Sequence, residues 1–138
     1  MGKIELSSEA KDFLCAVAAK VPEKEKLKEL SPALFAACDT ENPGIRRTYL
    51  LGCCSSAIQC GKDGKPKGNV AIGIGLLAKE ALELLANEPD NVSSIALIFG
   101  GISNFFVFPH AKYCDAGASE NVKRELLGLA NRLRWHGC

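Results

Sequence analysis

The chain has 138 residues, of which 47% are apolar, and its formal net charge is +1. These values are typical of one ordinary globular domain, so we expect a single domain over residues 1–138. The near-zero net charge provides no basic surface for nucleic acid or for an acidic membrane, and we expect neither as a partner. The longest apolar tract, residues 95–108, is shorter than the roughly 20 residues that a bilayer span requires.

The first residues and the cysteines indicate a cytoplasmic location. The N-terminal segment, MGKIELSSEAKD, is charged within three residues and lacks an apolar core, so we expect no signal peptide. The seven cysteines are an odd number, which favours reduced thiols in a cytosol-like compartment.

Capping residues and prolines predict two helical pieces at the start of the chain. Ser7 precedes a helix over about residues 8–20, whose apolar positions fall on one side and which Pro22 ends. Ser31 and Pro32 combine a capping residue with a proline at the first helical position, which starts a short helix.

A longer helix is predicted over about residues 43–60. Asn42 and Pro43 repeat the signal of a cap followed by proline, and Gly61 stands where a C-terminal cap would fall. The segment 61–68, GKDGKPKG, lacks the order of a phosphate-binding loop, so we expect a solvated connection.

Two stretches of the second half resemble earlier parts of the same chain. Residues 78–87 (AKEALELLAN) share five identical residues with residues 122–131 (VKRELLGLAN), at an offset of 44 residues. The predicted helix 43–60 matches a second helix, 92–106, at an offset of 47, including its capping loop. Two helices repeated at this period are typical of HEAT and armadillo solenoids.

The same region carries a resemblance to the armadillo family. The run IFGGISNFF (98–106), followed by AKYCDAGASENVKRELL (111–127), resembles the boundary between two armadillo repeats. Ser103-Asn104 and Asp115–Ala118 match the family's motifs at this boundary. This resemblance implies an all-α fold, either a short armadillo- or HEAT-like solenoid or a compact helical-repeat domain. The chain would begin with an N-terminal helix over residues 8–20. The approximate repeat units that follow it are 24–60, 69–108 and 111–135. A helix covered on both sides would explain the apolar segment 92–106, and Gly100 and Gly101 would allow close approach of a neighbour.

The resemblance implies a non-catalytic protein-interaction or scaffold module. In armadillo-like stacks the long helices line a groove that binds a partner protein or peptide. The candidate groove residues on helices 43–60 and 91–106 are Arg46, Arg47, Ser56, Gln59, Ser103 and Asn104. Asn104 is the first choice, because an amide can donate to and accept from a partner's backbone at once. The C-terminal helix either caps the array or meets another molecule. We expect the latter, a contact with a partner or with a second copy as a homodimer, anchored by Leu133 and Trp135, because buried aromatic residues dominate interfaces.

An α+β interpretation competes with the helical one. The runs SSIALIF and ISNFFVF flank Gly100-Gly101 as the strands of a β-hairpin would, and the result would be a small sandwich similar to a roadblock-type scaffold. The internal similarity favours the helical repeat.

A thiol-dependent redox or metal-binding function is the other alternative. The sequence has no C-x-x-C and no H-x-x-x-H pattern, so a metal site would have to combine Cys60, His110 and Cys114. A reactive thiol at Cys53 or Cys138 would need a neighbouring group that lowers its pKa. We therefore expect no metal, no cofactor and no enzymatic activity.

Overall fold

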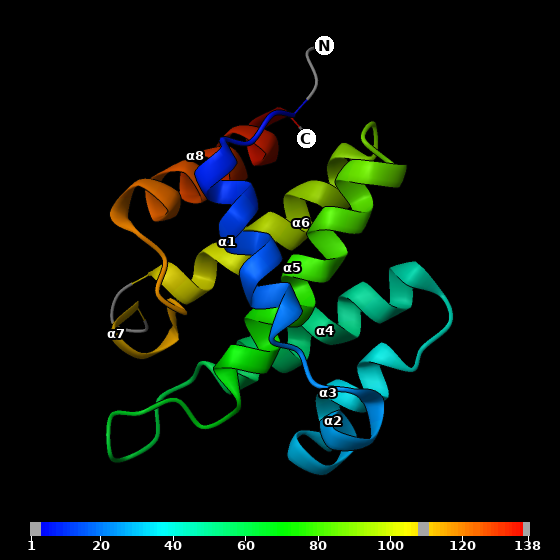
Figure 1. Cartoon of the computed structure of the whole chain (residues 1–138), viewed down its shortest axis with the longest axis vertical. Coiled ribbons are helices and arrows are strands. Elements are labelled where there is room, and N and C mark those ends of the chain that lie inside the picture. The colour runs from blue at the N-terminus through cyan, green and yellow to red at the C-terminus, as the bar shows by residue number, and fades with distance from the viewer. Residues whose placement is uncertain (1–3, 108–110, 137–138) are drawn as a thin grey trace.

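The protein is an assembly of helices. A computed structural model describes residues 4–107 and 111–136, with side chains through Leu133, and no segment within these residues forms a strand (Figure 1). In this part of the chain the β contacts are limited to one isolated bridge, between Cys60 and Pro66. The all-α prediction is confirmed, and the hairpin interpretation is wrong because its first run and the two glycines lie in one helix, α6 (Val92–Ser103).

The first helix, α1 (Ser8–Ala19), begins where the sequence predicts. The Ser7 hydroxyl oxygen accepts a hydrogen bond from the Ala10 amide at 3.1 Å, which satisfies one of the amide groups left free at a helix start. One side of α1 is buried, and its positions repeat at helical spacing: Ala10, Leu14, Val17 and Ala18.

Three helices follow in the first half: α2 (Lys24–Leu30), α3 (Pro32–Cys38) and α4 (Pro43–Ala57). Asn42 caps α4 by accepting from the Ile45 amide at 3.0 Å, as predicted, whereas Ser31 makes no side-chain cap for α3. The predicted end of α4 near residue 60 is wrong by three residues. The chain turns back at Ala57, whose carbonyl accepts from the Gly68 amide at 2.9 Å.

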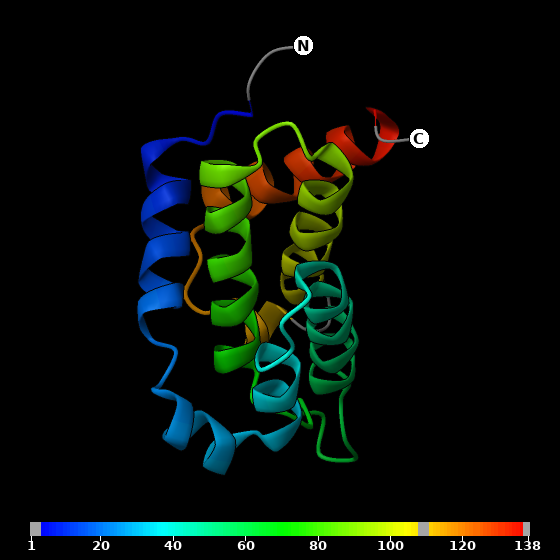
Figure 2. The ribbon, with the colours of Figure 1, turned by 90° about the vertical axis from the view of Figure 1, so that its right-hand side faces the viewer.

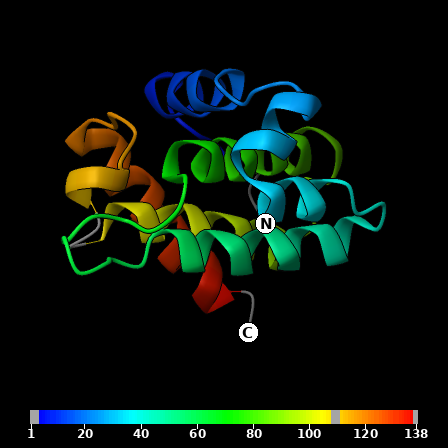
Figure 3. The same cartoon turned by 90° about the horizontal axis from the view of Figure 1, so that it is seen from below.

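The central helix is α5 (Val70–Asn87), which the loop 58–69 connects to α4. Its buried positions occupy nearly its whole circumference between residues 72 and 78, because α1, α4 and α6 all pack against it. In Figure 2 these helices form successive layers, with α1 on one side of α5 and α4 with α6 on the other. Figure 3 shows the same order from below.

The second half contains α6, a short 3-10 turn η1 (Asn104–Phe106), α7 (Ala111–Cys114) and α8 (Glu120–His136). The predicted helix 92–106 is thus α-helical only to Ser103. Three helices, α4, α5 and α8, contact α6. α8 runs across the layers, from α1 at its first turns to α6 further along.

Three glycines illustrate what close packing requires. A Cβ at Gly75 of α5 would lie 2.6 Å from the Val17 carbonyl oxygen, so only glycine allows α1 to approach this closely. The expectation of close approach at Gly100 and Gly101 is half right. A Cβ at Gly101 would clash with the Leu51 side chain of α4, but a Cβ at Gly100 would meet nothing within 4 Å.

The first and last helices hold each other directly. The Ser7 amide and hydroxyl both donate to the Glu125 carboxylate of α8, the amide at 2.8 Å, and the Ser119 hydroxyl donates to Glu9 at 2.7 Å. This packing is compatible with a helical repeat but differs from a linear stack, in which each unit contacts only its neighbours. Among the described residues, no helix is both long and apolar enough to cross a membrane.

Candidate functional site

A groove of about 670 Å³ lies between α4, α6 and α8. We call it the α6 groove, because α6 and the turn after it form its floor with Ser93, Ala96, Leu97, Gly100, Gly101, Ser103, Asn104 and Phe105. A volume of this size lies within the range of roughly 300–1,000 Å³ that binding pockets occupy. It is the strongest candidate for a binding site in the part of the chain that the structure describes.

The floor follows one face of α6. Ser93, Leu97, Gly100 and Asn104 are three or four residues apart, so they lie in a row along the helix. Leu97 is 62% exposed, the largest exposure among the described large apolar side chains. The opposite face, with Ile95, Ile98 and Ile102, is buried in the core. The apolar helix is therefore covered on three sides by protein and is open on the fourth.

Two helices provide the walls. From α4 come Leu51, Cys54, Ser55 and Ile58, and from α8 come Ala130, Asn131 and Leu133. The α4 wall is held at a fixed distance because Leu51 fills the space that Gly101 leaves open on α6. The α8 wall packs directly against α6 and is also tied to the start of α1, where the capping residue Ser7 bonds to Glu125.

Among the residues that the structure describes with side chains, which end at Leu133, none that lines the α6 groove is charged. The sequence explains this for α4 and α6, because its two longest charge-free stretches, residues 48–61 and 91–109, contain α4 from its second turn onward and the whole of α6. In a chain with 24% charged residues, two such stretches facing one groove set its chemistry. The charge-free stretches are the signal that could have identified Leu51, Ile58 and Leu97, which sequence reasoning did not single out as site residues.

Two of the predicted site residues lie in the α6 groove. Asn104 is exposed at its floor. Ser103 is 8% exposed, and its hydroxyl donates to the Gly100 carbonyl at 2.8 Å, so it belongs to the helix more than to the surface. Ser56 and Gln59 are exposed on and just after α4 but do not line the groove, whereas the neighbouring Ser55 does.

The predicted homodimer contact can be located only in part. Leu133 is 6% exposed and is one of the residues that line the α6 groove, so little of it faces outward. The side chain of Trp135 lies outside the described residues. Self-association through this helix stays a prediction.

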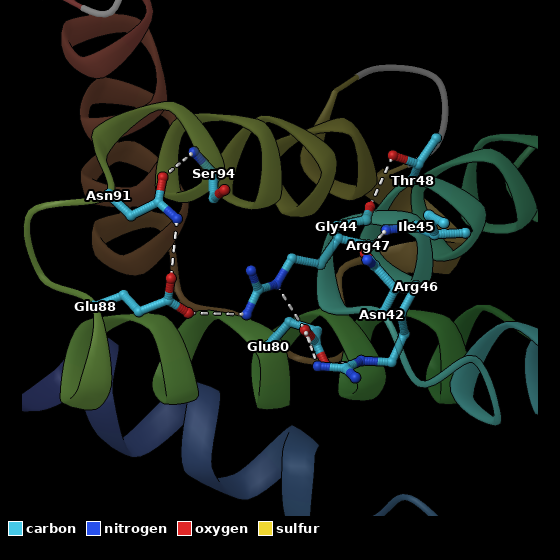
Figure 4. Close-up of polar contacts among 10 residues, drawn as sticks. All are labelled: Asn42, Gly44, Ile45, Arg46, Arg47, Thr48, Glu80, Glu88, Asn91 and Ser94. Carbon is cyan, nitrogen blue, oxygen red and sulfur yellow. Dashed lines mark hydrogen bonds and ion pairs between the residues drawn. The ribbon is translucent and has the colours of Figure 1, made fainter.

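Arg46 and Arg47 lie away from the α6 groove, on the side of α4 that faces α5. Both guanidinium groups bond to the Glu80 carboxylate of α5, with Nε distances of 3.1 Å and 2.9 Å respectively (Figure 4). The hydrogen bond to Glu80 raises the pKa of Arg46 above its ordinary value. Arg47 is only 7% exposed, which leaves almost none of it for a partner to contact.

Arg47 also joins the α5–α6 connection to this cluster. Its Nη2 atom lies 3.5 Å from a Glu88 carboxylate oxygen, close enough for an ion pair but without the geometry of a hydrogen bond. Glu88 in turn accepts from the Asn91 amide at 3.2 Å, and Asn91 caps α6 by accepting from the Ser94 amide (Figure 4). The two arginines therefore orient α4, α5 and the start of α6, and so shape the groove indirectly.

Three of the cysteine thiols lie in surroundings that favour the protonated form. Burial raises the pKa of Cys54, in the groove wall, to about 12. Burial also raises the pKa values of Cys38 and Cys114. These three thiols are protonated at neutral pH and are poor nucleophiles and poor metal ligands. The described residues contain no group of three metal-binding side chains; His110, the middle member of the suggested metal site, lies outside them.

No family model, curated protein or solved structure matches this chain. Any functional assignment therefore depends on the α6 groove and its chemistry.

Proposed function

We propose that this chain is a non-catalytic protein-interaction module, an armadillo- or HEAT-like helical repeat, which holds a segment of a partner protein in the α6 groove. The observation that carries the proposal is the open face of α6: an uncharged groove with Leu97 mostly in water. Covering a leucine side chain is worth about 1.5–3 kcal/mol relative to leaving it exposed, so a partner that covers this face gains binding energy.

The arrangement of α4 and α6 supports the repeat. These two helices match at an offset of 47 residues in the sequence, and they are in contact, with Leu51 packed at Gly101. In a helical-repeat protein, matching helices of successive units lie side by side in this way. The six cysteines of the described part are all free of disulfides, which supports a reducing, cytoplasmic compartment for the protein.

The test uses a random peptide library displayed on phage and the whole chain as bait. Selected peptides are then synthesised and their affinities measured by calorimetry for the wild type and for two variants. Leu97→Glu places an unpaired charge in the groove. The matched control, Tyr49→Glu, changes a side chain on α4 that is 55% exposed and does not line the groove.

We expect Leu97→Glu to weaken binding at least tenfold, or about 1.4 kcal/mol, and Tyr49→Glu to change it by less than about twofold. Both positions are exposed, so both variants should keep the wild-type circular dichroism spectrum. A failure to select any peptide, or peptides that bind Leu97→Glu as well as the wild type, would remove the proposal.

A further inference from the structure

Building on the proposed function, we infer that the partner segment is an α-helix, which lies along α6 and presents an uncharged face of small and apolar side chains. Around α6, the helices α4, α5 and α8 occupy three positions and the groove is the fourth. The occupant completes the set of helices around α6.

The length of the floor suits a helix. Ser93 and Asn104 mark its two ends, and the eleven steps between them, at about 1.5 Å each, give a floor of about 16 Å, or three helical turns. A ligand helix of three to four turns would contact the floor over its whole length. Three to four turns is also the average length of helices in globular proteins.

The side chains of the floor are small where a ligand helix would lie against it. A Cβ at Gly100 would meet nothing within 4 Å, so the backbone of α6 is directly accessible there. Ala96, one turn earlier, adds only a methyl group. Small residues at the contact allow two helix axes to come to the short end of the 8–10 Å range. Leu97, one turn before Gly100 and mostly exposed, is then available to pack against the side of the incoming helix.

Backbone hydrogen bonds distinguish a helix from an extended peptide. An extended segment in the groove would bring one N–H and one C=O group per residue, and each buried group would need a partner. The backbone of α6 is used within its own helix, and the Ser103 hydroxyl is already bonded to Gly100. Few lining side chains remain that can donate or accept, among them Ser55, Ser93, Asn104 and Asn131. A helix satisfies its own backbone and needs none of them.

The absence of charge in the groove determines which face the helix presents. A carboxylate or an ammonium group pointing into the groove would lose its water without finding an opposite charge among the lining residues. Charged side chains of the partner must therefore point outward, which describes an amphipathic helix with an uncharged inner face.

The test begins with the peptides selected for the proposed function. In each, one central residue whose replacement by alanine leaves affinity unchanged is replaced by proline, and separately a lactam bridge that favours the helix is built between outward positions four residues apart. We expect proline to weaken binding at least tenfold, because it breaks a helix, and the bridge to tighten binding severalfold.

Two glycine variants locate the contact. Gly100→Leu fills the floor of the groove, and Gly128→Leu adds the same side chain to an exposed site on α8 that is also open and does not line the groove. We expect only Gly100→Leu to weaken the selected peptides at least tenfold, while circular dichroism remains that of the wild type for both variants.

The outcomes separate the two proposals. Peptides that bind in the groove, lose affinity with Leu97→Glu, but tolerate proline would overturn the helix and leave the proposed function standing. Gly100→Leu without effect on such peptides would also overturn the docking of a helix along α6. If no peptide is selected, both proposals fall together. If the protein then binds an apolar dye, and Leu97→Glu abolishes that binding, the groove is assigned to a small molecule instead.

Discussion

The Glu80 carboxylate is the shared partner of both arginines of α4. It lies on α5 with 9% of its side chain exposed and accepts three hydrogen bonds, one from Arg47 at 2.9 Å and two from Arg46 at 3.1 and 3.3 Å. Replacing it with alanine leaves the Arg47 guanidinium buried with only Glu88 nearby, at 3.5 Å.

The expected cost of Glu80→Ala is about 3 kcal/mol of unfolding free energy. Removing one partner of a buried ion pair costs about 3–5 kcal/mol, because the remaining charge has lost its water. The lower end applies here for two reasons. Arg46 is 16% exposed and can turn toward solvent, and Glu88 still offers Arg47 part of a counter-charge. A loss of this size is a large fraction of the roughly 5–15 kcal/mol that stabilises a typical domain.

Urea unfolding followed by circular dichroism at neutral pH measures the effect. The matched variant is the double replacement Arg47→Met with Glu80→Leu, which removes the buried pair and fills its volume with apolar atoms. We expect the double variant to lie within about 1 kcal/mol of the wild type, because such replacements are often neutral. If Glu80→Ala cost less than about 0.5 kcal/mol, or if the double variant were no more stable than Glu80→Ala, the buried cluster would not be holding α4 to α5.

Two further predictions concern packing and pH. Gly75→Ala should lower the unfolding free energy by about 1–3 kcal/mol, because its Cβ meets the α1 backbone. Gly128→Ala, in open space on α8, should raise the unfolding free energy by up to about 1 kcal/mol. Thermal melts that shifted in the same direction for both variants would contradict this. Burial alone would raise the pKa of Asp115, but hydrogen bonds from the Lys123 ammonium at 2.8 Å and from the Gly117 amide hold it below its ordinary value. The stability that this carboxylate contributes is therefore complete above about pH 4 and is lost as the pH falls. The difference in unfolding free energy between the wild type and Asp115→Asn should accordingly shrink in acid. A difference that is the same at pH 3 and pH 7 would contradict the assignment.

Local signals predicted the helices well. A cap is a contact between residues three apart, so Ser7 and Asn42 could be assigned from their neighbours alone, and both make the expected hydrogen bonds. The partner of Arg47 could not be found in this way, because Glu80 is 33 residues away and reaches it only after α4 has packed across α5. Two arginines beside a predicted groove therefore suggested a binding role, where the structure has an internal ion pair.

The groove itself was only half predictable, and the two adjacent glycines of α6 show why. Neighbouring residues on a helix point about 100° apart, so one of the pair can face α4 while the other faces solvent. The sequence indicates that a glycine pair in a helix needs a reason, but which glycine faces which neighbour depends on how α4 and α8 are placed. Asn104 was identified because it matches an armadillo motif and carries an amide that can both donate and accept, whereas Leu97 looked like any other core leucine.

The bonds between Ser7 and Glu125 have a consequence for how the protein is made. The two residues are separated by 118 positions, and a ribosome that adds about 5–20 residues per second needs roughly 6–24 s to cover that distance. During that interval α1 has emerged without α8, which packs against it in the folded protein, so part of its apolar side stays accessible to chaperones. Completion of the native structure is therefore a late event in synthesis, set by the arrival of the last helix.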